Sequence, residues 1–265
     1  MSSHDRGSQT AELAADKAGL ERELYLRAWV EYDGTDFFGF QRQATHRTVQ
    51  GELERALEAV TQQKVRVIGA GRTDAGVHAA GQVVAFRVRW HHPISALERA
   101  WNALLPEDIA VWGVEPAPKG FHPRFSARSR YYRYTIWNGP RRSPLHRRYA
   151  WVLPGPLDDE AMQEATRILV GEHDFAAFGR PPRGENTVRR ILRATWTREG
   201  HTLRFDIEGN AFLKHMVRNM VGTLVCVGRG EKPPEWVAEV LESRDRSQCA
   251  PPAPACGLCL MGIVY

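Results

Sequence analysis

Residues 64–90 read KVRVIGAGRTDAGVHAAGQVVAFRVRW, and this stretch restricts the fold more than any other. Its two ends are rich in valine and other apolar residues, which favours a strand over 64–70 and another over 81–90. Between them, residues 69–81 contain four glycines. Glycine lets the backbone turn tightly and approach a ligand closely. The stretch therefore predicts two strands joined by a loop that is suited to binding.

Elements on either side of this stretch complete an α/β unit. Apolar residues alternate along 23–32, which is typical of a strand with one buried face. A helical spacing of apolar residues appears at 49–62 and at 93–105, and a short apolar run at 109–114 predicts another strand. The resulting β-α-β-β-α-β order over about ninety residues is close to the ferredoxin-like arrangement.

The second half repeats the same kinds of element after a proline-rich linker. We therefore expect an α+β fold in which two ferredoxin-like-related α/β units form a mixed, largely antiparallel sheet flanked by helices, with a cleft between the units. The elements expected in this half are strands at 131–137 and 147–153, a helix at 158–170, strands at 189–197 and 202–209 joined by a hairpin at Glu199 and Gly200, helices at 211–227 and from Pro234, and a final strand at 258–265.

The chain has 265 residues, of which 43% are hydrophobic, enough for one large core or two smaller ones. We expect a disordered N-terminal extension at 1–22, an N-terminal α/β domain at 23–117 that carries the glycine-rich loop, and a C-terminal α/β domain at 118–265. The extension lacks the apolar core of a signal peptide, and the longest apolar stretch, from Met220, is too short to span a membrane. We therefore expect no membrane segment.

Cysteines are few: there are four, with Cys249, Cys256 and Cys259 near the C-terminus. This number does not support a disulfide framework, so it indicates a reduced, cytoplasmic protein. Cys256 and Cys259 have C-x-x-C spacing, but a second pair or flanking histidines do not accompany them, and we expect no metal site.

Basic residues outnumber acidic ones, and many of them gather in one region. The formal net charge is +5, and the 36 basic residues include only five lysines. No acidic residue stands between Glu115 and Asp158, where arginines alternate with aromatic residues. Arginine binds phosphate and aromatic rings stack on bases, so this pattern favours a nucleic-acid surface. The alternative is that the tyrosines are core residues and the arginines merely solvated. A second basic block at 180–193 favours the nucleic-acid interpretation.

The glycine-rich loop offers the strongest candidate for chemistry. It presents Arg72, Thr73 and Asp74 consecutively. Asp74 could act as a nucleophile or base, and Arg72 could hold a phosphate; the alternative is a turn in which Asp74 bonds its own backbone. The loop matches neither a Walker loop nor a dinucleotide fingerprint, and the chain has no deaminase signature. We interpret His78 as a packed or hydrogen-bonded residue. A glycosidase-like carboxylate pair stays open but would not explain the basic surface.

These features together resemble the tRNA pseudouridine synthase A (TruA) family. The resemblance runs from about Leu24 to Tyr265 and departs from the family in the N-terminal extension and the cysteine-bearing tail. The segments that carry it are TVQGELERAL at 48–57, GRTDAGVHA at 71–79, FHPRFSARSRYYRY at 121–134, GEHDFAAF at 171–178 and NAFLKHMVRNMVG at 210–222.

The resemblance implies an isomerase that needs no cofactor. It would convert uridine to pseudouridine in the anticodon stem-loop of tRNA, at nucleotides 38–40, moving the bond between uracil and ribose from N1 to C5. The resemblance also implies a homodimer whose two subunits contact the tRNA. Asp74 matches the family's catalytic aspartate, and Arg218 matches the basic residue that pairs with it. Tyr132 matches the tyrosine that packs on the target uracil, and Arg72 the arginine implicated in extruding the nucleotide.

Elementary chemistry agrees with these roles. Breaking the bond between base and ribose within a stem requires the nucleotide to leave the stack. A guanidinium beside Asp74 would favour the charged carboxylate where the flipped base excludes water. We expect Leu213 to lie on the core stripe of the helix at 211–227, with Lys214, Arg218 and Gly222 on another side. A surface ion pair for Arg218 and a plain core position for Tyr132 are the structural alternatives.

Two other functions stay open at this point. A non-catalytic tRNA-binding module or RNA chaperone would bind RNA in a salt-sensitive manner and leave it unchanged. A glycosylase using the same aspartate would release free uracil. Whether Asp74 attacks C1′, attacks C6 or removes a ribose proton is also open.

Overall fold

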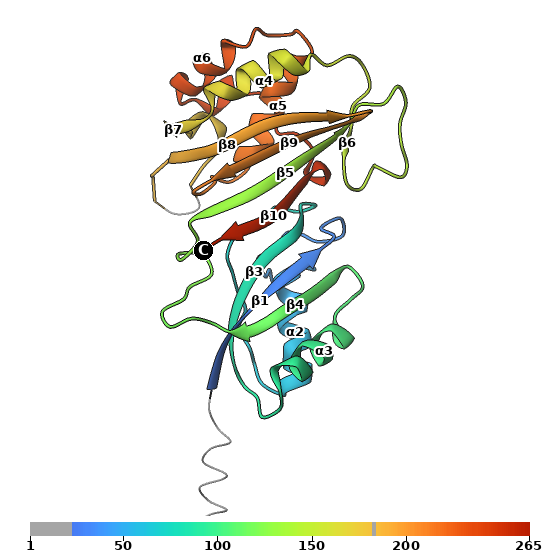
Figure 1. Ribbon diagram of the computed structural model, residues 1–265, viewed down its shortest axis with the longest axis vertical. Coiled ribbons are helices and arrows are strands. Elements are labelled where there is room, and N and C mark those ends of the chain that lie inside the picture. The colour runs from blue at the N-terminus through green and yellow to red at the C-terminus, as the bar shows by residue number, and fades with distance from the viewer. Residues whose placement is uncertain (1–22, 182–183) are drawn as a thin grey trace, which may run out of the picture.

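The computed structural model describes residues 23–181 and 184–265, so the extension predicted at 1–22 lies outside the described residues. One ten-stranded sheet runs through both halves of the described chain in the order β4-β1-β3-β10-β5-β9-β8-β7, with β2 paired to β3 and β6 to β5 (Figure 1). The pairings of β10 with β3 and of β5 with β6 are parallel, and the others between the described strands are antiparallel. The prediction of an α+β fold with a mixed, largely antiparallel sheet is confirmed.

The N-terminal half of the sheet is built from alternating strands and is covered by two helices. Along β1, Leu26, Ala28 and Val30 are fully buried because every second side chain faces the core. Thr48 caps α2 by accepting a hydrogen bond from the Gly51 amide. The elements of this half are β1 (Glu23–Tyr32), α2 (Val49–Thr61), β2 (Ile68–Gly69), β3 (His78–Arg89), α3 (Ile94–Leu104) and β4 (Ile109–Pro116).

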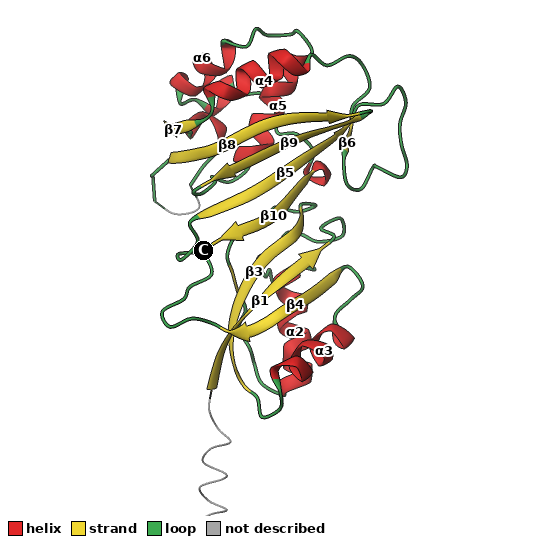
Figure 2. Cartoon of the chain, viewed as in Figure 1, coloured by secondary structure: helices red, strands yellow, loops and turns green. Residues whose placement is uncertain are grey.

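The C-terminal half carries the remaining strands and three helices, grouped at the other end of the sheet in Figure 2. A hairpin at Gly200, where φ is +58°, joins β8 to β9, as predicted. The elements are β5 (Ser129–Trp137), β6 (Trp151–Val152), α4 (Asp159–Ile168), β7 (Gly171–Asp174), β8 (Val188–Glu199), β9 (Thr202–Gly209), α5 (Met216–Gly228), α6 (Trp236–Ser243) and β10 (Leu258–Val264).

The last strand of the chain joins the two halves. β10 lies between β3 and β5, and Leu260 is the register partner of Ala79 on one side and of Tyr132 on the other. This placement puts the start of β3, with the glycine-rich loop before it, one strand away from β5 (Figure 1). The boundary predicted between residues 117 and 118 falls in the connection from β4 to β5.

Several predicted bounds are wrong. The helix expected from 211 begins at Met216, because the Lys214 amide bonds the Arg180 carbonyl and His215 adopts φ +65°, which interrupts a helix. Leu213 and Lys214 therefore precede α5. Gly222 is buried against the Pro251 carbonyl rather than lying on a polar side of the helix. The strands expected at 64–70 and 147–153 are each only two residues long in the structure, as β2 and β6.

Within 23–181 and 184–265, no helix combines the length and apolar character needed to cross a membrane.

Candidate active site between the two halves of the sheet

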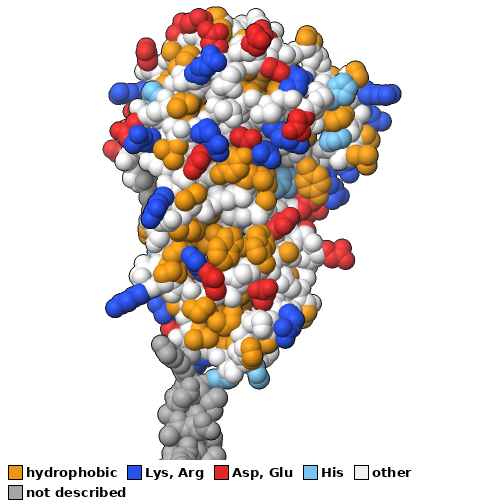
Figure 3. Space-filling model, viewed as in Figure 1, with side chains coloured by type: hydrophobic (Ala, Val, Ile, Leu, Met, Phe, Trp, Pro, Cys, Tyr) orange, Lys and Arg blue, Asp and Glu red, His pale blue; other side chains and the backbone are white. Residues whose placement is uncertain are grey.

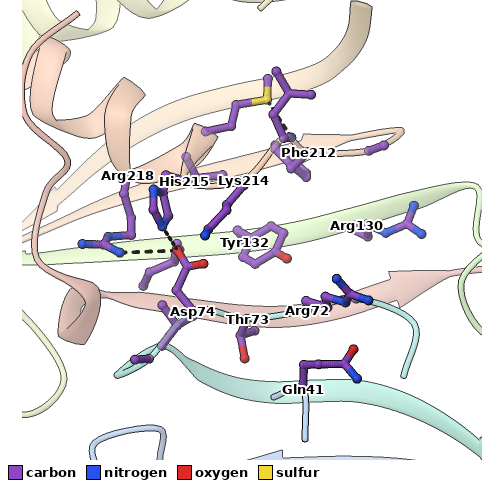
Figure 4. Close-up of a pocket in the computed structure, with 18 of the residues that line it drawn as sticks. Gln41, Arg72, Thr73, Asp74, Arg130, Tyr132, Phe212, Lys214, His215 and Arg218 are labelled. Carbon is purple, nitrogen blue, oxygen red and sulfur yellow. Dashed lines mark hydrogen bonds and ion pairs between the residues drawn. The ribbon is translucent and has the colours of Figure 1, made fainter. Parts of the chain in front are cut away.

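A cavity of about 720 Å³ opens between the glycine-rich loop and the segment that leads into α5. Its lining includes all four residues singled out in the sequence: Arg72, Asp74, Tyr132 and Arg218 (Figure 4). They come from the loop before β3, from β5 and from α5. The fold thus gathers residues that are up to 146 positions apart into one pocket, whose size suits a nucleoside-sized ligand.

The loop that carries Asp74 is held by hydrogen bonds to its own half of the protein. Gln82 is fully buried; its amide donates to the Gly71 carbonyl at 3.0 Å and its oxygen accepts from the Gly71 amide at 3.3 Å. The Thr73 carbonyl accepts from the Phe40 amide at 3.1 Å, and its hydroxyl lies 2.8 Å from the Tyr32 hydroxyl. The backbone that leads into Asp74 is therefore fixed at Gly71 and at Thr73.

The Asp74 carboxylate contacts two donors through the same oxygen. Its Oδ2 lies 3.4 Å from Nη1 of Arg218 and 3.4 Å from Nε2 of His215 (Figure 4). Within the described part of the chain, Oδ1 has no hydrogen-bond partner, and neither oxygen bonds the loop's own backbone. The side chain remains 26% exposed. One oxygen is thus held while the other stays available to a ligand in the cavity.

Arg218 is itself oriented by the C-terminal tail. Its Nε donates to the Ala253 carbonyl at 2.7 Å, and its own carbonyl accepts from the Ala253 amide at 3.0 Å. Its side chain is only 16% exposed, so the guanidinium that faces Asp74 is largely shielded from water. This arrangement differs from a surface ion pair, which holds two mobile side chains in solvent.

Tyr132 presents its ring to the cavity from β5. The ring packs edge-to-face with Phe212 at 5.1 Å between centroids, and burial raises the pKa of the Tyr132 hydroxyl to about 12. The hydroxyl therefore stays neutral in the physiological range. Tyr132 is thus both a buried residue and a residue that lines the cavity.

The rest of the lining is strongly basic. Asp74 is its only acidic residue among the described residues, whereas the basic ones are Arg72, Arg124, Arg130, Lys214 and Arg218. In the described ranges, the side chains of Arg72 and Lys214 make no hydrogen bond or ion pair, and both are exposed. Burial lowers the pKa of Arg130, whose guanidinium donates to backbone carbonyls rather than to a carboxylate. The cavity wall therefore holds cationic donors ready for an anionic ligand.

Phe212, Lys214 and His215 were not assigned to the site from the sequence, although all three line the cavity. All three belong to the segment NAFLKHMVRNMVG, where His215 precedes Arg218 by three positions. The sequence predicted a helix from residue 211, whereas these residues precede α5 and line the cavity. His78 is buried and its Nδ1 accepts from the Gly34 amide at 3.0 Å, as expected of a packed histidine. Among residues 23–181 and 184–265, no cluster of His, Cys, Asp and Glu suits a metal ion.

A single carboxylate in a basic, aromatic-lined cavity on a mixed sheet is the kind of site found in enzymes that act on nucleic acid. The sequence profile of the family described as tRNA pseudouridine synthase matches residues 28–126 and 165–265. The chain therefore belongs to this family, whose members are isomerases that act on tRNA, and the resemblance inferred from the motifs is confirmed.

Individual relatives agree over nearly the whole chain. The tRNA pseudouridine synthase A of Pelobacter propionicus is 46% identical over 241 residues, covering 91% of this chain and 99% of the relative. The protein of the same name from Citrifermentans bemidjiense is 47% identical and covers 91% of this chain and 97% of its own length. That of Pseudothermotoga lettingae is also 47% identical, with 90% and 98% covered.

Proposed function

We propose that this protein converts uridine to pseudouridine in the anticodon stem-loop of tRNA, with Asp74 as the catalytic carboxylate. The observation that carries the proposal is the position of Asp74, the only acid among the described residues of a basic cavity that also holds Tyr132. The reaction breaks the N1–C1′ bond and forms a C5–C1′ bond, while one proton leaves C5 and one is gained at N1. The atoms balance without a redox partner or cofactor.

The target nucleotide is flipped out of the stem into the cavity. Flipping costs a few kcal/mol, and contacts to phosphates and an aromatic ring can offset that cost. Tyr132 supplies the ring against which uracil packs. Arg72, exposed at the cavity wall and without a protein partner in the described ranges, extrudes the nucleotide and then lies close to its phosphates.

Asp74 reacts through the oxygen that the protein leaves unoccupied. Arg218 donates to Oδ2 at 3.4 Å and holds this oxygen in place when the base enters the cavity. Oδ1 then faces the ribose and uracil of the flipped nucleotide. The shielding of Arg218 strengthens the attraction, because charges interact more strongly where water is excluded.

A homodimer is the second part of the proposal. The face of the sheet opposite the main core carries a separate apolar cluster, which includes Tyr25, Trp29, Phe121 and Tyr265, and nearby Trp112 is 39% exposed. Figure 3 shows hydrophobic side chains gathered across the middle of the molecule. A second copy of the chain would cover such a face, since exposed apolar patches mark interaction sites. The proposed location is the cytoplasm.

One assay tests the proposed function. The protein is incubated with an unmodified tRNA transcript, without added cofactor, and pseudouridine is mapped chemically along the RNA. We expect new pseudouridine confined to the anticodon stem-loop. Binding without any change in the RNA would favour the non-catalytic tRNA-binding module, and release of free uracil would favour the glycosylase.

A further inference from the structure

His215 occupies an unusual place in the backbone. It stands directly before α5 with φ +65° and ψ 0°, in the left-handed region that residues other than glycine rarely adopt. A glycine would adopt these angles without a steric penalty. The position is therefore strained for a residue with a side chain, and strained residues gather at functional sites.

The contacts of the His215 side chain point to Asp74. Its Nε2 lies 3.4 Å from Oδ2 of Asp74, which is an ion-pair distance, and within 23–181 and 184–265 the side chain has no hydrogen bond and no second ion pair. The same Oδ2 is contacted by Arg218 on the next turn of the chain. Figure 4 shows the imidazole and the guanidinium reaching the carboxylate from the same wall of the cavity.

The charged groups around His215 come from three elements. Asp74 faces it from the loop before β3, Arg218 and the preceding Lys214 lie beside it at the start of α5, and Arg246 approaches from a short 3₁₀ helix. Burial and the three cations lower the pKa of His215 below its ordinary 6.5, although Asp74 opposes them. At neutral pH the imidazole is therefore uncharged.

We propose that His215 is a positioning residue that, in its neutral form, donates from Nε2 to Oδ2 of Asp74 and so keeps Oδ1 aimed at the flipped uridine. The inference rests on the proposed function, because it assigns His215 a part in the same reaction. The single 3.4 Å contact from Arg218 restrains Oδ2 only weakly, and a second donor to the same oxygen further restrains rotation of the carboxyl group about Cβ–Cγ. Protonated His215 would place a second positive charge, besides that of Arg218, next to the carboxylate and make the carboxylate less reactive.

The test compares three variants at this one position. His215→Gly removes both the donor and the backbone strain. His215→Gln places an amide N–H near the position of Nε2, whereas His215→Asn places its amide closer to the backbone, near Nδ1, and serves as the matched control. Single-turnover pseudouridine formation at saturating tRNA, tRNA affinity and thermal stability are measured for each variant and for the wild type.

We expect His215→Gly to melt no lower than the wild type and to bind tRNA equally well, yet to react about 10- to 100-fold more slowly. His215→Gln should recover most of that loss, and His215→Asn should not. The wild-type rate should fall as the pH drops through a value below 6.5, and this acid limb should be missing in His215→Gln.

Two results would overturn the inference. A wild-type rate in His215→Gly would mean that the residue only starts the helix, and equal losses in His215→Gln and His215→Asn would mean that donation to Oδ2 is not its role. Both comparisons require that the wild type forms pseudouridine. A wild type that forms no pseudouridine would instead contradict the proposed function.

Discussion

The two walls of the cavity are held in different ways. The wall with Asp74 is fixed from within the N-terminal half, through Gln82, Phe40 and Tyr32. The wall with Arg218 depends on the far end of the chain, because Ala253 bonds both its side chain and its carbonyl. The carboxylate is therefore held by groups of the N-terminal half, and its cationic partner by the segment that precedes β10. Substitutions in the wall that carries Arg218 should disturb its contact with Asp74 while leaving the glycine-rich loop intact.

The largest effect is expected at the carboxylate itself. Asp74→Asn preserves the shape of the side chain but removes its charge, and we expect pseudouridine formation to fall by about 10³-fold or more. Affinity for tRNA should stay near the wild-type value, since Arg72, Lys214 and Tyr132 are unchanged. Residual turnover within tenfold of the wild type would count against Asp74 as the reacting group.

The next largest effect is expected at the opposite wall. Arg218→Lys keeps one charge but loses the planar group that bonds Asp74 and Ala253 together, so the rate should fall about 100-fold. Arg198, paired with Asp159 on the surface, is the matched control, and Arg198→Lys should leave the rate unchanged. Similar losses in both variants would show that the effect comes from folding rather than from the pairing at the site.

A smaller effect should follow from moving the tail without touching the site. A β-carbon on Gly222 would stand 2.1 Å from the Pro251 carbonyl oxygen, so Gly222→Ala must displace the tail that orients Arg218. We expect about 1–3 kcal/mol of lost stability and about a tenfold slower reaction. Gly262→Ala, on β10, has open space around the new carbon and should change neither quantity. Denaturant unfolding measures the stability, and single-turnover assays measure the rate. A wild-type rate in Gly222→Ala would mean that the tail does not influence the function of Arg218.

The smallest effect on folding is expected from an arginine with no partner in the described ranges. Arg72→Gln should leave stability unchanged, weaken tRNA binding and lower its salt dependence by about one phosphate contact. Arg133→Gln, which leaves Asp206 without its ion-pair partner, should instead reduce stability. Binding titrations at several salt concentrations separate the two cases. An unchanged salt slope in Arg72→Gln would mean that Arg72 does not contact the RNA backbone.

The sequence predicted the fold well where the patterns are local. The alternation along β1 and the hairpin at Gly200 were recognisable because one buried face leaves a period of two in the sequence. The loop with Arg72 and Asp74 was recognisable because its glycines and polar residues interrupt two apolar strands.

The rest of the site could not be read from local patterns. The residues NAFLKHM have an apolar spacing that suits a helix, but the Lys214 amide pairs with Arg180 and the backbone turns at His215. The central position of β10 depends on its pairing with β3 and β5, which are distant in sequence. The contact between Arg218 and Ala253 is likewise a consequence of tertiary packing.

The most direct measurement of the central claim follows the proton that leaves C5. A tRNA transcript labelled with tritium at C5 of its uridines is mixed with excess protein, and tritium released to water is counted alongside free uracil. We predict that the wild type releases tritium from the target uridine without freeing uracil and that Asp74→Asn releases none. Equal release by both proteins, or no release by the wild type, would contradict the claim that the Asp74 carboxylate drives the isomerisation.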